Sequence, residues 1–491
     1  MTKNILEKFK SYIYLLPLLF GVFIAADDQT VIVTILPELL IDMNVGINEL
    51  SKASWTITAY LIGYAAMLPI MGNISDKYGW KFTYNISILI FVIGSIFVVL
   101  SAFLSDIYIN HSNFFYWILI ISRFIQAIGA GALIPITISA SSKVAPKLSP
   151  PIAFGLVGAS AEAGGVIGPF WGGIITNFAS WEWVFLINIP LVLITSYFIF
   201  KCPSGSKNGI KKIDFKNGII FGLIIITSTI GFSRIGNPDF TMVFLLIVAV
   251  ILLITFIFNI KSTKVNLIPK KLINFSYFFW ANVTHFLIGS SLIIVMVTVP
   301  LVCATIYSMT ALESGFELLK FTIFLGVFAL IGGLITKNNK GYLCTIIGLL
   351  LSGSGMLSMS LWNSNSTELI KFISLIVSGS GFGLLVAPIT DQAITKLDEN
   401  IKGSASSLLT TSRILGMIVC LAILTSIGTL QFYDLLLGIP SFNEQNIQFV
   451  EKTLISAQTI FSRFFLWGSL ICYLTLLPAT IMHHPKAFKF Y

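Results

Sequence analysis

The chain has 491 residues, of which 56% are hydrophobic and 10% are charged, and its mean hydropathy is +0.91. This composition excludes a soluble globular protein and indicates a chain that is largely embedded in a membrane. The formal net charge of +9 comes from lysines in short loops between apolar segments. We therefore do not expect a nucleic-acid partner.

Fourteen apolar segments are each long enough to cross the ~30 Å of a bilayer's hydrocarbon core as a helix. They cover roughly 12–34, 54–72, 82–102, 115–137, 152–176, 183–200, 217–234, 239–259, 278–300, 318–336, 341–361, 369–390, 403–429 and 460–482. The predicted fold class is an all-α polytopic membrane protein. The first segment has a basic start but no small-residue cleavage site, so we interpret it as a retained helix and not a signal peptide.

Lysines precede the first helix, follow the even-numbered helices and close the chain, whereas the alternate loops are acidic. By the positive-inside rule, both termini are predicted to be cytoplasmic. The five cysteines are scattered and show neither a metal-ligand spacing nor a disulfide framework, so no metal site is expected. They are Cys202, Cys303, Cys344, Cys420 and Cys472.

Two sequence patterns recur in the two halves of the chain. The Gly-x-x-x-(Asp or Thr)-Lys pattern of 72–77 returns at 332–337, and the glycine-rich stretch 129–135 returns at 381–388. Such repeats are typical of secondary transporters. They predict two six-helix bundles, 1–200 and 276–491, that flank inserted helices 7 and 8 with basic loops in 201–275. The alternative is a chance likeness between glycine-rich membrane helices.

The segment from Gly72 to Lys81 connects helices 2 and 3 with almost no loop. Gly72 and Gly79 are expected to let the two helices turn and approach each other. Asp76 is expected at the start of helix 3, where a carboxylate meets unpaired backbone N–H groups. We predict that Asp76 latches the cytoplasmic side during transport. The alternative is an ordinary tight turn.

Charged residues inside the predicted helices mark a candidate site. Asp27 and Asp28 lie in helix 1, and each would cost roughly 2.5–3.5 kcal/mol at a helix centre facing lipid. Adjacent residues differ by about 100° around a helix, so one of the two is expected to face a cavity. Arg123 in helix 4 falls at a similar depth, roughly 10–15 Å below the outer face. The two residues are therefore predicted to form a charge pair or to share a polar cavity; the alternative is a static buried ion pair that holds the helices together.

Glu162 lies near the middle of helix 5, just before a string that contains Gly168, Pro169, Gly172 and Gly173. The glycines allow close helix packing, and the proline removes one backbone hydrogen bond. Because no partner is evident nearby in the sequence, we expect Glu162 to be protonated at rest or neutralised by a bound cation. The alternative is a glutamate bonded to a neighbouring serine or backbone group.

Secondary candidates lie in the second half of the chain. Arg413 is predicted in helix 13 and His285 in helix 9. His285 could change charge near neutral pH, although a lone histidine in a membrane helix more often bonds one helix to another.

Several of these strings together resemble the major facilitator superfamily, in its fourteen-helix drug:proton antiporter branch (EmrB/QacA). The resemblance is carried by 28–37, 55–69, 72–81, 123–131, 168–173 and 181–190, with sparser matches at Asp214 and 403–416. It implies proton-driven export without a cofactor, with the helix 1 aspartate and the helix 4 arginine in the coupling machinery. Glu162 and Glu182 depart from the pattern, and the former puts the substrate's charge preference in doubt.

The predicted function is a proton-coupled antiporter that exports drugs or amphipathic or cationic small molecules across the bacterial cytoplasmic (inner) membrane, with a role in multidrug efflux and antibiotic resistance. The alternative is an exporter or facilitator of an endogenous metabolite such as a siderophore, an organic acid or a sugar-like solute. Nutrient import is disfavoured by the helix 5 string. An enzyme is not expected, because no catalytic motif or loop of domain size is present. Whether a periplasmic adaptor and an outer-membrane channel take over the exported molecule is left open.

Overall fold

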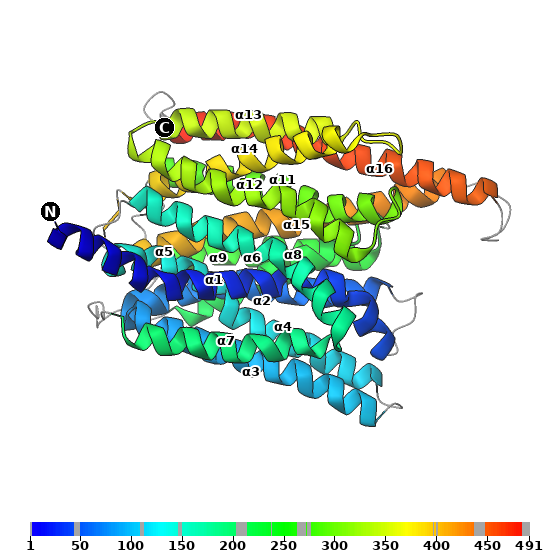
Figure 1. The fold of residues 1–491 in the computed structure, drawn as a ribbon. Helices are drawn as coiled ribbons and strands as arrows, with labels where there is room; N and C mark the ends of the chain where they lie inside the picture. The colour runs from blue at the N-terminus through cyan, green and yellow to red at the C-terminus, as the bar shows by residue number, and fades with distance from the viewer. Residues whose placement is uncertain are drawn as a thin grey trace.

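The computed structural model describes residues 2–43, 50–108, 112–145, 150–202, 214–236, 238–262, 272, 276–395, 397–398, 401–436 and 447–483. Within these residues the chain is helical, and fourteen spans are long and apolar enough to cross a membrane. The predicted all-helical, fourteen-span fold class is thereby confirmed (Figure 1).

The helices before the middle of the chain are α1 (Thr2–Asp42), α2 (Leu50–Tyr78), α3 (Trp80–Ile107), α4 (Ser112–Gly131), α5 (Leu133–Val144), α6 (Pro150–Phe178), α7 (Glu182–Phe200), α8 (Phe215–Phe232) and α9 (Phe240–Ser262). Those that follow are α11 (Ser276–Thr305), α12 (Ala311–Lys337), α13 (Gly341–Met359), α14 (Glu368–Ile394), α15 (Lys402–Leu436), α16 (Ile447–Leu474) and α17 (Leu476–His483).

Two predicted spans are each interrupted. The fourth span consists of α4 and α5, which are separated at Ala132, and the last consists of α16 and α17, which are separated at Thr475. Each interruption lies three residues before a proline, Pro135 or Pro478. A proline has no backbone N–H and crowds the carbonyl four residues earlier, which weakens the helical hydrogen bonds of the preceding turn.

The connection between α2 and α3 has almost no loop, as predicted, but it lies later in the sequence than expected. α2 continues through Tyr78, and Gly79 alone makes the turn with a φ of +89°, a conformation that favours glycine. The prediction that Asp76 caps the start of α3 is wrong, because Asp76 lies in the last turn of α2. Gly72 likewise lies inside α2. The side chain of Asp76, and with it the predicted latch, lies outside the described part of the structure.

Lys81 ties this turn to the end of another helix. Its Nζ donates hydrogen bonds to the carbonyl oxygens of Phe200 at 2.7 Å and Cys202 at 3.0 Å. These carbonyls lie at the C-terminal end of α7, where a cation is favoured by the helix dipole and by the unpaired carbonyls. The α2–α3 turn is therefore fastened to α7.

α6 is the central helix of the molecule, lying between α1 on one side and α12 on the other (Figure 1). A Cβ atom at Gly164 would lie 2.1 Å from the carbonyl oxygen of Phe23, and one at Gly168 would lie 2.6 Å from that of Asp27. A Cβ at Gly172 would lie 2.8 Å from Val31. These glycines therefore bring the backbones of α6 and α1 into direct contact, as predicted for the helix 5 string. Pro169 lies inside α6, which continues past it.

The other face of α6 meets the second half of the chain. Near its start, a Cβ at Gly155 would lie 2.7 Å from the carbonyl oxygen of Ala329 in α12. Towards its other end, the rings of Phe170 and Phe316 meet edge to face at 5.0 Å.

α15 packs against α2 and α5. The inserted pair is less central, because α8 packs against α2 and α15 and α9 packs chiefly against α8. The division of the chain near residues 200 and 275 stays a prediction.

The contact between α6 and α1 offers a matched pair of substitutions. A Cβ at Gly168 would lie 2.5 Å from Thr30 Oγ1, whereas one at Gly173 would make an ordinary contact of 3.5 Å with Thr34. We expect Gly168→Ala to destabilise the protein by about 1–3 kcal/mol through overpacking and to reduce transport. Gly173→Ala is expected to change little. Thermal unfolding of both variants in detergent tests this, and equal melting temperatures would contradict the packing argument.

Candidate functional site

A buried charge network surrounds Asp28 in the middle of α1. The Asp28 Oδ2 atom accepts a hydrogen bond from Arg123 Nη1 at 2.6 Å, and both side chains are fully buried. Its Oδ1 atom accepts from Gln126 Nε2 at 2.9 Å and from Asn188 Nδ2 at 3.2 Å. Helices α4 and α7 thus supply three donors to one carboxylate, which stabilises a charge that would otherwise be costly in hydrocarbon.

Arg123 is held in place by more than its partner carboxylate. Its Nη2 atom donates to the backbone carbonyl of Asp28 at 2.9 Å, and Nη1 also contacts Gln126 Oε1 at 2.5 Å. The guanidinium lies over the rings of Tyr60 and Phe185, at 4.3 Å and 5.3 Å from their centres. Such cation–π contacts in a desolvated site favour the charged guanidinium. Its position therefore depends on α1, α2, α4 and α7 together.

The predicted agreement in depth between Asp28 and Arg123 is confirmed by their direct contact. Of the two aspartates, Asp28 is the one that contacts Arg123, and which of them faces a cavity stays a prediction. Asp27 is 4% exposed, and its buried Oδ1 atom has no hydrogen-bond partner among the residues that the structure describes. A static ion pair and a proton-handling pair share this geometry, so the predicted role of these residues stays a prediction.

Side chains from three other helices bind the backbone of α1. Tyr84 of α3 donates to the carbonyl of Leu18 at 3.1 Å, and Ser160 of α6 donates to that of Leu19 at 2.6 Å. Tyr60 of α2 donates to the carbonyl of Ala25 at 3.1 Å. These bonds hold the helix that carries Asp28 without using any α1 side chain.

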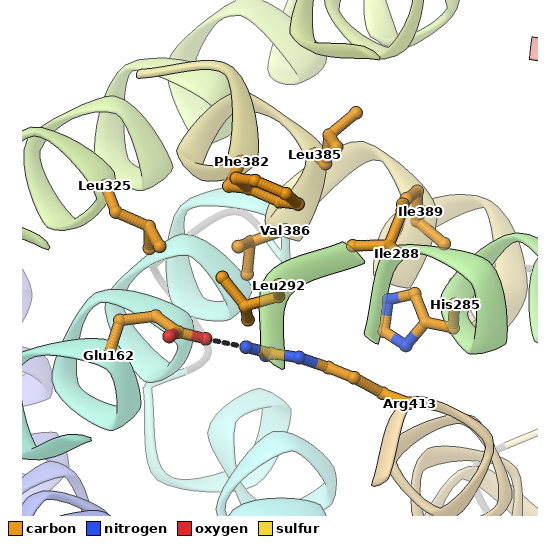
Figure 2. Close-up of a pocket in the computed structure, with 10 residues that line it drawn as sticks. All are labelled: Glu162, His285, Ile288, Leu292, Leu325, Phe382, Leu385, Val386, Ile389 and Arg413. Carbon is orange, nitrogen blue, oxygen red and sulfur yellow. Dashed lines mark hydrogen bonds and ion pairs between the residues drawn. The ribbon is translucent and has the colours of Figure 1, made fainter. Parts of the chain in front are cut away.

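A second charge pair joins the two halves of the chain. Glu162 of α6 and Arg413 of α15 form an ion pair (Figure 2). The glutamate side chain is 4% exposed and the arginine side chain 21% exposed. Arg413 supplies the counter-charge, a partner that was not among those expected for Glu162, namely a proton, a bound cation, or a neighbouring serine or backbone group. The sequence gives no hint of this pairing, since the two residues are 251 positions apart.

This ion pair lies at the edge of a small cavity of about 30 Å³. Its polar lining consists of Glu162, Arg413 and His285. Its apolar wall comes from α11, α12 and α14 and includes Leu292, Leu325, Phe382, Val386 and Ile389 (Figure 2). The cavity thus places a few convergent polar groups against an apolar wall, with room for water-sized molecules.

His285 reaches the cavity from α11. Its Nδ1 atom lies 3.2 Å from the carbonyl oxygen of Leu409 in α15, so the expected bond between helices is present. Close packing supports it one turn further along, where a Cβ at Gly289 would lie 2.1 Å from the carbonyl oxygen of Arg413. The contact between α11 and α15 therefore positions both His285 and Arg413.

Two tyrosines of α2 lie between the two charge pairs. Tyr60 contacts Arg123, and Tyr64, one turn further along, is close enough to Arg413 and Glu162 to interact with their charges. The ring centres of the two tyrosines are 6.2 Å apart. The two buried tyrosines thus extend along α2 from the Asp28 network toward the Glu162–Arg413 pair.

Several residues of the site were not among the candidates from the sequence. Gln126 lies three positions after Arg123. A helix places residues three apart on the same face, so this spacing could have indicated that Gln126 belongs to the site. Asn188, Tyr60 and Phe185 lie in the strings 55–69 and 181–190 that carry the family resemblance, but no site role was predicted for them. No cluster of three or more potential metal ligands occurs within the described residues.

Comparison with curated proteins gives relatives of similar length. A triacylglyceride transporter of Mycolicibacterium hassiacum is 28% identical over 431 residues, which cover 84% of this chain and 78% of the relative. A triacylglyceride transporter of Mycobacterium tuberculosis is 28% identical over 452 residues, covering 88% and 85%. A probable triacylglyceride transporter of Mycobacterium leprae is 26% identical and covers 95% of both chains.

Solved structures show the same fold. The human organic anion transporter MFSD10 superposes with a TM-score of 0.63 at 12% identity, covering 94% of this chain and 99% of that one. The proton:xylose symporter XylE gives 0.61 at 12% identity, covering 95% and 96%. The family model described as Major Facilitator Superfamily matches residues 18–420. The chain therefore belongs to the major facilitator superfamily, a family of membrane transporters, which also confirms the expectation that it is not an enzyme.

Proposed function

We propose that this protein exports an amphipathic, lipid-like molecule in exchange for protons, by alternating access. The observation that carries the proposal is the ion pair between Glu162 and Arg413, which bridges the two halves of the chain at the edge of an apolar cavity. In alternating access, the halves must separate on one side of the membrane at a time. A charge pair across their interface can therefore control the separation.

Protonation of Glu162 would weaken this pair. The neutral acid keeps a hydrogen bond but loses the Coulombic attraction to the guanidinium, which is strong where the effective dielectric constant is low. Because Arg413 is partly exposed to the cavity, a substrate that enters can also compete for it. Proton binding and substrate binding then act on the same contact, and linkage requires that each changes the affinity for the other.

Asp28 supplies the second proton-handling group in this proposal. Its carboxylate is held by Arg123, Gln126 and Asn188, so adding a proton would release part of that network. α1 lies in backbone contact with α6 at Gly164 and Gly168. A shift of α1 that follows protonation of Asp28 would therefore be transmitted to the helix that carries Glu162.

The substrate class is inferred from the relatives and from the cavity wall. The mycobacterial relatives are named triacylglyceride transporters, which favours the alternative of an endogenous metabolite over a multidrug pump. Within that alternative, we propose a lipid as the substrate in place of a siderophore, an organic acid or a sugar-like solute. Arg413 already neutralises Glu162, so a cationic substrate is no longer needed to balance this carboxylate. A bacterial cytoplasmic membrane is the proposed location, by analogy with these bacterial relatives.

Asp28→Asn should abolish proton-driven export while the protein still folds and inserts. The amide cannot carry the transported proton, and it forfeits a charge-assisted hydrogen bond to Arg123 of about 1.5–3 kcal/mol. Lipid export driven by an imposed pH gradient in proteoliposomes measures this. Glu38→Gln is the matched control, since Glu38 lies exposed on the same helix. Normal gradient-driven export by Asp28→Asn would refute the assignment.

Arg413→Met should destabilise the protein by about 3–5 kcal/mol, because it leaves Glu162 as a buried charge without a counter-ion. The charge-swapped double variant, Glu162→Arg with Arg413→Glu, should recover much of that loss. Thermal unfolding in detergent checks the stability, and the pH dependence of export checks the function. If the swapped pair is as unstable as Arg413→Met, the two side chains do not interact in the folded protein.

A further inference from the structure

The hairpin formed by α8 and α9 lies outside both charge sites, where the two halves of the chain meet. α2 of the first half and α15 of the second pack against each other, and α8 contacts both. Ile225, near the middle of α8, is buried in a hydrophobic cluster that includes Leu68 of α2 and Ile418 of α15. The hairpin therefore covers the line of contact between α2 and α15, which we call the seam.

One end of the hairpin is attached to α2. A Cβ atom at Gly218 would lie 2.6 Å from Ile70 Cγ1, and one at Gly222 would lie 3.3 Å from the Cβ of Ala66. Ile70 also belongs to a small hydrophobic cluster with Phe256 of α9. Among the residues that the structure describes, this cluster draws its members from α2, α8 and α9 alone. The hairpin is thus fixed to the first half at the end of α2 that is predicted to be cytoplasmic.

The opposite end of the hairpin is attached to α15. The backbone N–H of Gly236, in the turn between α8 and α9, donates to Ser426 Oγ at 2.6 Å. A Cβ atom at Gly236 would lie 2.4 Å from the carbonyl oxygen of Ser426, so the two backbones are in direct contact. The end of α2 on this side packs elsewhere, since Ala59 lies in a cluster with residues of α1, α3, α4, α6 and α7. At this end the hairpin is fixed to the second half.

The two attachments are crossed, which has a consequence for alternating access. When the halves separate on the outer side, the outer end of the hairpin can follow α15. When they separate on the cytoplasmic side, its cytoplasmic end can follow α2. Neither opening has to break an attachment. A hairpin that joined α2 to α15 on one side only would oppose opening on that side, because packed elements would have to separate there.

We propose that α8 and α9 form a diagonal strap that stays attached to α2 at its cytoplasmic end and to α15 at its outer end throughout the transport cycle. The strap lets the halves rock against each other, keeps them from sliding apart, and covers the seam in every state. This inference rests on alternating access in the proposed function. It depends neither on the substrate nor on the two charge pairs.

Two covalent tethers can hold the strap in its observed position. Ile70→Cys and Gly218→Cys are within reach of a disulfide, because a Cβ at 218 lies 2.6 Å from Cγ1 of residue 70, one bond beyond the Cβ of that residue. At the outer end, a bismaleimide can join Ser233→Cys to Ile427→Cys. Both positions are exposed, and using them leaves the hydrogen bond between the hairpin turn and α15 in place. The five native cysteines are replaced by alanine, and the disulfide is formed before the maleimide is added.

A matched tether on the outer side provides the control. Phe170→Cys of α6 and Phe316→Cys of α12, whose native ring centres lie 5.0 Å apart, are joined by the same bismaleimide. This bridge links the two halves directly, without the strap. We expect it to lower the pH-driven export of a fluorescent triacylglyceride in proteoliposomes about tenfold or more, whereas the doubly tethered strap should keep about half of the rate or better.

Hydrogen exchange at the facing ends of α2 and α15 supplies a second measurement that needs no substrate. Exchange that double tethering leaves unchanged supports the strap. Exchange that falls as far as in the control contradicts it.

The outcomes distinguish this inference from the proposed function. Export that falls as far as in the control, with one tether or with both, would overturn the strap, because the hairpin would then release one half in every cycle. Lipid export would still stand, since the untethered protein performs it. If the untethered protein exports no triacylglyceride, the proposed lipid function fails, and hydrogen exchange decides whether the strap stays attached.

Discussion

The direct backbone contact between α1 and α6 is the constraint on which the rest of the site depends. Glycines at 164, 168 and 172 leave no room for a Cβ against α1, so the two helices are held closer than side chains would allow. α1 carries Asp28 and α6 carries Glu162. The two carboxylates that the proposed mechanism uses therefore stand on adjoining helices whose relative position is closely restricted, and neither can move far without displacing the other helix.

The two charge sites differ in their access to the cavity, and this difference separates their proposed roles. Asp28 and Arg123 are fully buried, with hydrogen bonds from several helices of the first half. Arg413 is partly exposed and pairs with Glu162 across the interface between the halves. The first site suits a group that responds to protons alone. The second suits one that responds to both protons and substrate.

The number of spans and the shared depth of Asp28 and Arg123 could be predicted from the sequence, because apolar length and helical rise are local properties of the chain. The pairing of Glu162 with Arg413 could not. It depends on how α6 and α15 meet, and nothing in either segment encodes its distant partner. The cavity escaped prediction for the same reason, since its walls come from several helices. The predicted position of the turn between α2 and α3 is wrong, because α2 continues past Asp76 to Tyr78 and Gly79 alone makes the turn.

The hydrogen bonds that hold α1 have a consequence for how this protein can vary. Tyr84, Ser160 and Tyr60 all donate to main-chain carbonyls of α1, and every residue type supplies a carbonyl. The positions that accept these bonds are thus free to change their side chains, subject to packing, without loss of the bond. The three donors have no such freedom. Natural variants of this transporter should accordingly keep the hydroxyls that surround α1 more strictly than the α1 residues they bind.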